Sequence, residues 1–184
     1  MALTRIKLTF EEFCQLPESN LPHELIDGEL RMPAAPNVRH QVILYNIGDP
    51  MRAHVRPRRL GLVLQSPVDV VLDEARPLVV QPDLLFVSQE RIGIVRDKVY
   101  GAPGLTVEVF SGSGAVFDRT EKAAFYAQYG VREYWLVDPQ NETVEVRRLE
   151  PQGYETVGIF RRGDTLRSIV LPDLRLSLDE IFAA

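Results

Sequence analysis

The sequence contains one cysteine, Cys14, among 184 residues. One cysteine cannot form a disulfide within the chain, which is typical of the reducing cytoplasm. A membrane-spanning helix needs about 18 uncharged apolar residues in succession, and no run in this sequence approaches that length. The N-terminal Met-Ala-Leu-Thr-Arg-Ile-Lys also lacks the apolar core of a signal peptide. We therefore expect a cytoplasmic protein that does not contact membranes, with Cys14 packed in its interior.

The sequence also lacks an excess of positive charge. Its 26 aspartates and glutamates outnumber its 21 lysines and arginines, which gives a net charge of −5. Proteins that bind nucleic acid mainly by electrostatics are usually basic, so a nucleic-acid contact here needs a local patch. Such a patch could be a phosphate-contacting strip beside an active site, although a solvated helix end is the alternative. The candidate residues are Arg52, Arg56, Arg58 and Arg59, with His54 among them.

The length and the pattern of segments predict one domain over residues 1–184. Thr9 and Glu12 have the spacing of a capping box, and Asp27-Gly28 favours the type I′ turn of a hairpin. Pro50 should kink or split the helix around it. We expect helices over 9–16, 38–55 and 119–129, a C-terminal helix opened by a second capping box at Ser177 and Glu180, strands over 61–65, 68–72, 80–87, 105–110 and 134–137, and hairpins from 24–30 and from 143–149 with 154–160.

Strands followed by a helix and a further strand predict a mixed sheet with helices packed on it. The expected fold class is α/β (α+β): a mixed central β-sheet flanked by helices, with added N-terminal and C-terminal β-hairpins. Its central unit is a helix, a three-strand meander, a second helix and a strand.

Two carboxylates stand in apolar runs that should form consecutive buried strands. Asp83 opens Leu84-Leu85-Phe86-Val87, and Glu108 lies inside 105–110, a strand with no polar face. Ionised groups in apolar surroundings need a cation, hydrogen-bond donors or a proton. If the strands pair, the carboxylates converge, and a hard divalent metal such as Mg²⁺ or Mn²⁺ is their natural partner. A turn-capping role for Asp83 and an ion pair for Glu108 are the alternatives.

Lys122 lies on the helix that follows the Glu108 strand. It could return to that strand's end and position the attacking water or stabilise charge on a phosphate. Asp118 is four residues earlier, so a surface ion pair along the helix is the alternative. Further candidates for outer-shell positions are Glu24, His40 and Gln41, although Glu24 alone is more typical of a surface carboxylate and His40 of a packed or capping residue. Tyr126 and Trp135 are interpreted as core aromatics.

These residues resemble the PD-(D/E)XK nuclease superfamily, and specifically its Uma-two family of restriction-type endonucleases. The resemblance implies a restriction-endonuclease-like core, a divalent metal held by Asp83 and Glu108, and hydrolysis of phosphodiester bonds in DNA. Phe110 stands where the parent motif has a lysine, and the resemblance assigns that lysine's place to Lys122. The segments that carry the resemblance are 23–30, 39–41, 67–72, 80–87, 107–111, Asp118 with Lys122, and 133–138.

The leading hypothesis is therefore a Mg²⁺- or Mn²⁺-dependent endonuclease that acts on DNA. The alternative is a catalytically silent nucleic-acid-binding or protein-interaction module on the same scaffold, because the lysine is missing from its standard place. A two-fold homodimer would let one site address each strand of a duplex, but the sequence shows no interface patch.

Overall fold

The computed structural model describes residues 7–17, 23–33, 35–110 and 115–183. Its main sheet has six strands in the described residues, in the order β11-β10-β9-β8-β6-β3. All neighbours are antiparallel except β8 and β9, which a helical crossover connects. The strands are β3 (Gly61–Gln65), β6 (Leu84–Ser88), β8 (Leu105–Val109), β9 (Glu133–Asp138), β10 (Thr143–Glu150) and β11 (Gly153–Arg161). The order β3, β6, β8 confirms the predicted meander.

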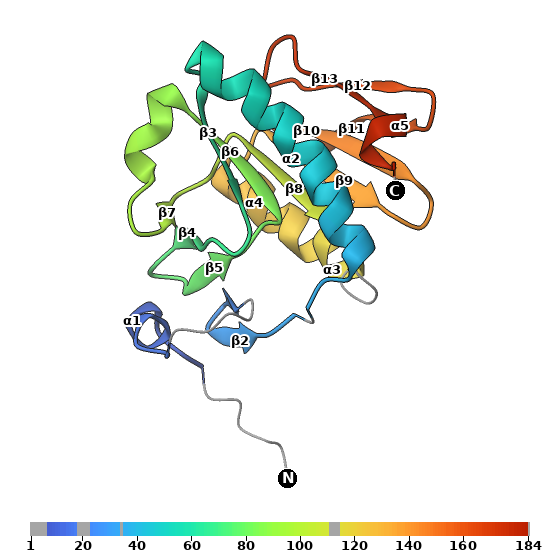
Figure 1. The fold of residues 1–184 in the computed structure, drawn as a ribbon. Coiled ribbons are helices and arrows are strands. Elements are labelled where there is room, and N and C mark those ends of the chain that lie inside the picture. Colours follow the sequence, from blue (N-terminus) through green and yellow to red (C-terminus); the bar gives the residue numbers. More distant parts are fainter. Residues whose placement is uncertain (1–6, 18–22, 34, 111–114, 184) are drawn as a thin grey trace.

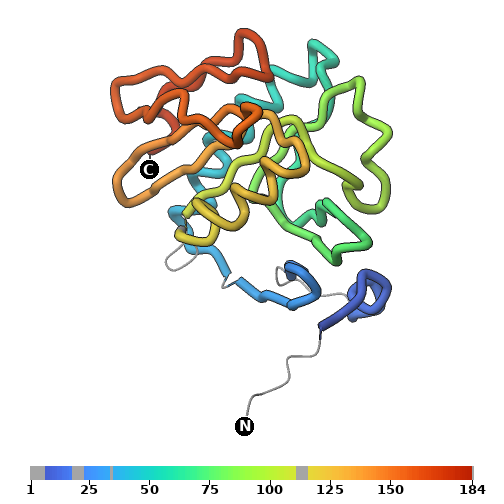
Figure 2. Tube along the Cα trace, turned by 180° about the vertical axis from the view of Figure 1, so that it is seen from behind, coloured from blue at the N-terminus to red at the C-terminus, as the bar shows by residue number. Residues whose placement is uncertain are grey.

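Helices cover both faces of this sheet. The helix α2 (Val38–Arg58) crosses one face (Figure 1). The crossover, made of α3 (Ala115–Phe117), the π-helical turn η3 (Asp118–Lys122) and α4 (Ala123–Tyr129), lies on the other face, which Figure 2 views. Within the described residues, none of the helices combines the length and the apolar character that crossing a bilayer requires.

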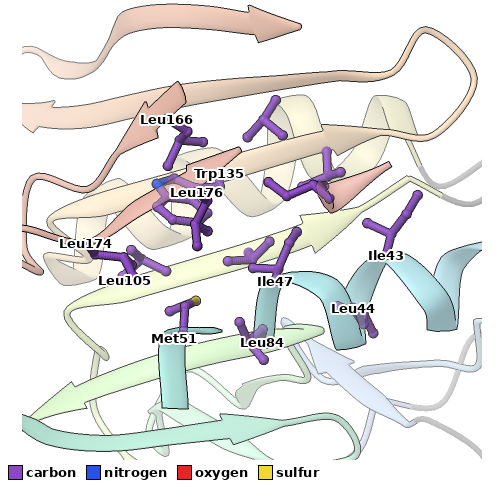
Figure 3. Packing of buried hydrophobic residues seen from close by; sticks show 14 of the residues in the cluster. Ile43, Leu44, Ile47, Met51, Leu84, Leu105, Trp135, Leu166, Leu174 and Leu176 are labelled. Carbon is purple, nitrogen blue, oxygen red and sulfur yellow. The ribbon is translucent and has the colours of Figure 1, made fainter. Parts of the chain in front are cut away.

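The alternation of side chains along β8 and β9 assigns two hydrophobic clusters to the two faces. Val107 of β8 and Trp135 of β9 pack with Ile47 and Met51 of α2 (Figure 3). Tyr134 and its neighbours on the opposite face pack with the crossover helix. Both faces of β8 are buried, as the sequence predicts, and its five residues are buried throughout. A mixed sheet between helices confirms the predicted fold class.

A second, five-stranded sheet has the order β2-β1-β5-β4-β7. The predicted N-terminal hairpin forms its edge, with Asp27 at φ 52° and Gly28 at φ 83° in the turn. The Thr9 capping box is also confirmed, because both of its hydrogen bonds form. The remaining elements are α1 (Phe10–Cys14), β1 (Glu24–Ile26), β2 (Glu29–Arg31), β4 (Val70–Asp73), β5 (Leu78–Val80), the 3-10 helix η1 (Gln89–Ile94), β7 (Val99–Tyr100), β12 (Thr165–Arg167), β13 (Arg175–Ser177) and α5 (Leu178–Ile181).

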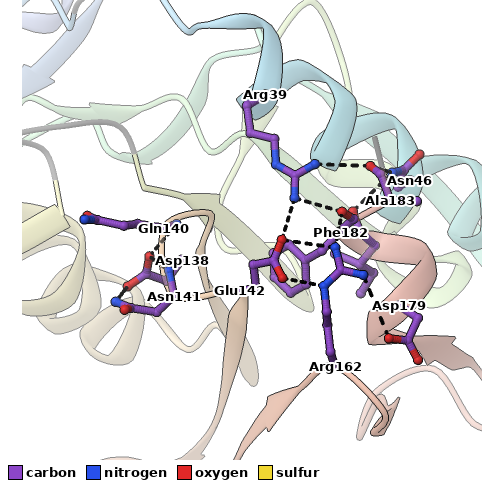
Figure 4. A network of polar contacts seen from close by, with 11 residues as sticks. Arg39, Asn46, Asp138, Gln140, Asn141, Glu142, Arg162, Asp179, Phe182 and Ala183 are labelled. Carbon is purple, nitrogen blue, oxygen red and sulfur yellow. Dashed lines mark hydrogen bonds and ion pairs between the residues drawn. The ribbon is translucent and has the colours of Figure 1, made fainter.

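The C-terminal end packs beside α2 through a polar network (Figure 4). Arg39 of α2 donates to the carbonyl oxygens of Phe182 and Ala183 at 2.8 and 3.3 Å. Arg162 donates to Phe182 O at 2.7 Å, and both arginines pair with Glu142. These donors satisfy carbonyls that a helix end leaves without intrahelical partners.

Three predictions about elements are wrong. The run 80–87 is two strands, because β5 ends at Val80 in the five-stranded sheet and β6 starts at Leu84 in the six-stranded sheet. A split of the helix at Pro50 is wrong, because α2 is continuous and its apolar face packs on the sheet from Ile43 to Val55; a kink at Pro50 stays a prediction. Ser177 occupies the N-cap of α5 but makes no capping hydrogen bond with its side chain.

The predicted burial of Cys14 is also wrong, since its side chain is exposed. The helix α1 has five residues and buries one of them, Phe13, so the next residue along the helix turns toward solvent. The hairpin of β12 and β13 was not predicted, because these strands have three residues each and give little alternation to detect.

Candidate active site

Asp83 and Glu108 lie at the same end of two neighbouring strands. Leu84, the first residue of β6, pairs with Val107 of β8, so the register brings Asp83 to the level of Glu108. The backbone N–H of Val109 donates to Asp83 Oδ2 at 2.8 Å.

The first turn of α2 provides a second donor for Asp83. His40 Nε2 lies 3.1 Å from Asp83 Oδ2. Because an ionised carboxylate can only accept, Nε2 carries the proton of this hydrogen bond. Both hydrogen bonds therefore fall on Oδ2, and no hydrogen bond from the described residues reaches Asp83 Oδ1.

Glu108 is held from the crossover helix on the opposite face. The buried Tyr126 of α4 donates its hydroxyl to Glu108 Oε1 at 2.7 Å. Lys122 Nζ lies 2.9 Å from the same oxygen. No hydrogen bond among the described residues ends on Oε2, so Glu108 repeats the pattern of Asp83: one oxygen is held twice and the other is not engaged.

The ammonium of Lys122 is the centre of a cluster of carboxylates. Besides Glu108, its Nζ lies 2.8 Å from Glu24 Oε1 and 3.7 Å from Asp118 Oδ1. Lys122 is 4% exposed, so these contacts are made out of water. The backbone N–H of Gln81 donates to the same oxygen of Glu24 at 3.0 Å.

Burial and mutual repulsion govern the ionisation of this cluster. Burial is the main cause that raises the pKa of Glu108 well above its ordinary value, and Asp118, Asp83 and Glu24 raise it further against the opposing effect of Lys122. Burial likewise raises the pKa of Asp118 to about 6. Burial alone would lower the pKa of Lys122, but the carboxylates around it raise this pKa well above the ordinary value. Lys122 therefore stays charged, while burial and repulsion favour the protonated forms of Glu108 and Asp118.

Comparison with known proteins agrees with this fold. The profile of the family Uma2, described as "Putative restriction endonuclease", matches residues 10–179. The chain belongs to the Uma2 family. This confirms the resemblance drawn from the sequence. None of the curated proteins matches the chain.

A solved structure shows the same fold over nearly the whole chain. The chain is similar to a crystal structure from Anabaena variabilis described as a putative nuclease belonging to DUF820. The two share 24% sequence identity and a TM-score of 0.80, over 95% of this chain and 97% of that one. At 24% identity, this similarity shows that the two proteins share a fold, and it does not show a shared activity.

The structure brings some of the predicted site residues of this Uma2 protein together and leaves others apart. Asp83, Glu108, Lys122, Glu24 and His40 belong to one connected set. Gln41 follows His40 on α2, half-buried, and its side chain makes no hydrogen bond with the described residues.

The arginine cluster is not beside the site. His40 and Arg56 are sixteen residues apart on one helix, which corresponds to about 24 Å at ~1.5 Å per residue. Arg52 is engaged by Asp49 and Gln65 at 3.0 and 2.7 Å. Arg56, Arg58 and Arg59 are exposed at the far end of α2. Their contact with nucleic acid stays a prediction, but their placement beside the site is wrong.

Sequence reasoning missed two members of the site. Asp118 was weighed as a surface partner of Lys122, but both side chains face the sheet and are buried. Tyr126 was interpreted as a core aromatic, and it is fully buried, but its hydroxyl binds Glu108. The signal for both was available, since Asp118, Lys122 and Tyr126 recur every four residues on one helix face that also carries apolar residues.

The donor set fits a divalent cation in charge and in chemistry. Three carboxylates surround one ammonium, and Asp83 lies close enough to Glu108 to raise its pKa. Asp83 and Glu108 each have an oxygen with no hydrogen bond from the described residues. The described residues contain no group of three or more histidine, cysteine, aspartate or glutamate side chains placed to hold a metal ion. Mg²⁺ usually needs only one or two carboxylates, because waters and substrate phosphates complete its shell.

Proposed function

We propose that this Uma2 protein is an endonuclease that hydrolyses phosphodiester bonds in DNA with Mg²⁺ or Mn²⁺. The observation that supports this proposal is the shared pattern of Asp83 and Glu108. In each carboxylate, two donors hold one oxygen, and the other oxygen is not engaged by the described residues. Preorganised ligands of this kind reduce the cost of binding a cation.

The roles of the residues follow from their contacts. Asp83 and Glu108 would hold the cation, while His40 and Tyr126 fix the orientation of these carboxylates. When bound, the divalent cation supplies Lewis-acid chemistry at the phosphate. Lys122 would orient the attacking water or stabilise the charge that develops on the phosphate oxygens. Glu24 and Asp118 keep Lys122 charged and in place.

One observation favours a second candidate, a catalytically silent module. Lys122 already bridges Glu24 and Glu108 at 2.8 and 2.9 Å, so the two carboxylates have a cation without any metal. In that case the cluster is structural, and neither Mg²⁺ nor Mn²⁺ binds.

Metal titration and cleavage of the same variants distinguish the two candidates. We expect Asp83→Asn and Glu108→Gln to weaken Mn²⁺ binding by at least the ~10–100-fold that the loss of an outer-shell partner costs, and to abolish cleavage of plasmid DNA. Calorimetry gives the affinity, and circular dichroism checks the fold. The control is Glu155→Gln, which removes an exposed carboxylate on β11. Wild-type activity in either site variant would refute the endonuclease proposal.

A further inference from the structure

The residues beside the candidate active site include two arginines that sequence reasoning did not consider. Arg31 pairs with Glu24 across the β1–β2 register, so its side chain leaves the hairpin on the same face as Glu24. Its guanidinium stacks on the Phe117 ring at 4.1 Å and lies 3.4 Å from Glu121. Arg31 therefore touches the helical turn that carries Lys122.

Arg119 is next to Asp118 in that same turn. Its guanidinium lies over the Phe110 ring at 5.1 Å, and it pairs with Glu145. Glu145 also accepts a hydrogen bond from Arg147 at 2.7 Å. Two arginines thus share one carboxylate, and this group carries a net positive charge in a protein with a net charge of −5.

Both arginines keep part of their side chains in solvent. The exposed fractions are 39% for Arg31 and 45% for Arg119. Stacking on an aromatic ring fixes the plane of a guanidinium and leaves its edges able to donate to another group. The Arg31–Glu121 pair is exposed on both sides, and such pairs contribute little stability, so a phosphate can replace Glu121 at small cost. Glu145 is buried, but it keeps its hydrogen bonds from Arg147 and Thr156 when Arg119 turns to a phosphate.

Three exposed apolar residues are close in the sequence to Arg31, to His40 and to the helical turn that carries Arg119. The most exposed large apolar side chains of the described residues are Val38, Val116 and Met32, at 79%, 73% and 65%. Met32 follows Arg31, Val116 precedes Phe117 and Asp118, and Val38 is two residues before His40. Each of these exposed apolar side chains is thus within two residues of a residue of the site or of one of its flanking contacts.

We propose that Arg31 and Arg119 contact the phosphate backbone of the nucleic acid beside the site, in place of the cluster at the end of α2. This inference rests on the proposed function, because it assigns the substrate contacts of the same site. Arginine matches the bidentate geometry of a phosphate, and the site's carboxylates would otherwise repel the strand. A basic contact beside them is therefore required.

Salt-dependent DNA binding tests the proposal. Fluorescence anisotropy with a labelled duplex, in EDTA to prevent cleavage, gives the slope of log affinity against log salt. Arg31→Gln and Arg119→Gln should each reduce that slope by ~0.9, which corresponds to about eightfold weaker binding at ~0.1 M salt. The matched control is Arg148→Gln, because Arg148 of β10 is 47% exposed and pairs with Glu150 of β10 and Glu155 of β11.

The outcomes separate this inference from the proposed function. If Arg31→Gln and Arg119→Gln bind like wild type, or if Arg148→Gln or Arg58→Gln loses as much affinity as they do, the inference is overturned. Wild-type protein that binds no DNA overturns it as well and points to a protein partner for this surface. Wild-type protein that binds DNA with the expected slopes but never cleaves it would refute the endonuclease proposal and support this inference. With an active enzyme, the loss should fall on KM more than on kcat.

Discussion

Glu108 is a carboxylate in a strand that is buried on both faces, and two neighbours make this tolerable. Tyr126 and Lys122 both bind its Oε1. The hydroxyl of Tyr126 and the charge of Lys122 together offset the free-energy cost of burying this carboxylate. Removing one partner of such a group leaves a desolvated carboxylate with fewer contacts. The residues around Glu108 therefore determine both its orientation and its charge.

Replacing Tyr126 by phenylalanine should weaken metal binding. The change removes one hydroxyl donor and leaves Oε1 with Lys122 alone, so Glu108 can rotate. We expect Mn²⁺ affinity to fall by about 10- to 100-fold, as for other outer-shell substitutions, measured by calorimetry. The control is Tyr129→Phe on the same helix, whose hydroxyl binds Asp73 outside the site at 2.7 Å. Equal affinities for the two variants would contradict a positioning role for Tyr126.

The metal-free protein should become more stable as the pH falls from 7 to 5. Burial raises the pKa of Asp118 to about 6 in the folded chain from 3.8, so the folded state binds this proton more tightly than the unfolded state does. The stabilisation is complete below pH 3.8 and is lost as the pH rises through 6. Urea unfolding at both pH values should show that Asp118→Asn removes about 1 kcal/mol of the gain. An unchanged gain in the variant would assign the effect to other groups.

The conformation of some residues could be predicted from their immediate sequence neighbours. The surroundings of others could not, because they depend on which surfaces become buried. The Thr9–Glu12 spacing and Asp27-Gly28 specify their structures within a few residues, and both form as predicted. The spacing of Asp118 and Lys122 fixes a shared helix face, but it does not say whether that face meets water or the sheet. That choice depends on how the crossover helix packs.

At the scale of elements, the crossover helix concentrates the site. Asp118, Lys122 and Tyr126 are supplied by consecutive turns that follow the Glu108 strand. The first of these turns, η3, is π-helical, a form that is common at functional sites. Periodicity predicted a helix over 119–129 with Gly130 as its C-cap, which is confirmed by φ 88° at Gly130, but apolar periodicity does not distinguish a π turn from an α turn.

Pro50 in α2 should be a local weakness. A proline in a helix interior removes one backbone hydrogen bond and costs about 3 kcal/mol relative to alanine. Because α2 continues through Pro50, we expect Pro50→Ala to raise the free energy of unfolding by about 1–3 kcal/mol in urea. Pro57→Ala, in the last turn, should gain less since helix ends fray. A destabilised Pro50→Ala protein would contradict this prediction.

The break between β5 and β6 shows where prediction from pattern fails for elements. The apolar run from Val80 to Val87 is interrupted by Gln81, Pro82 and Asp83, and the chain changes sheets there. Proline cannot donate a hydrogen bond to a sheet ladder, so a break at Pro82 was foreseeable. The partner of each half was not, because pairing depends on distant strands.

For the whole molecule, the six-stranded sheet joins the site to the C-terminal segment. Glu133, at the start of β9, is fully buried and accepts from Trp135 Nε1 at 2.7 Å. Its other oxygen accepts from the Ser168 hydroxyl and from the backbone N–H groups of Ile169 and Val170. Glu133 thus accepts four hydrogen bonds and holds the loop around Ser168 on the sheet. No local pattern in the sequence indicates that this loop and β9 are in contact.

The fold class was predictable because it depends on the order of elements, which apolar patterns report. The arrangement of the two sheets, and the burial of Glu133 under a loop 35 residues away, are tertiary features with no local signal. One domain over 1–184, homodimerisation and a cytoplasmic location stay predictions.

The network at the C-terminal end has a consequence for how this region can vary. Arg39, Arg162 and Asn46 bind the main-chain oxygens of Ile181, Phe182 and Ala183 (Figure 4). Every amino acid has the same backbone oxygen, so these hydrogen bonds do not depend on which side chain follows Phe182. They are sensitive to chain length, since ending the chain before Phe182 would remove the oxygen to which both guanidinium groups donate.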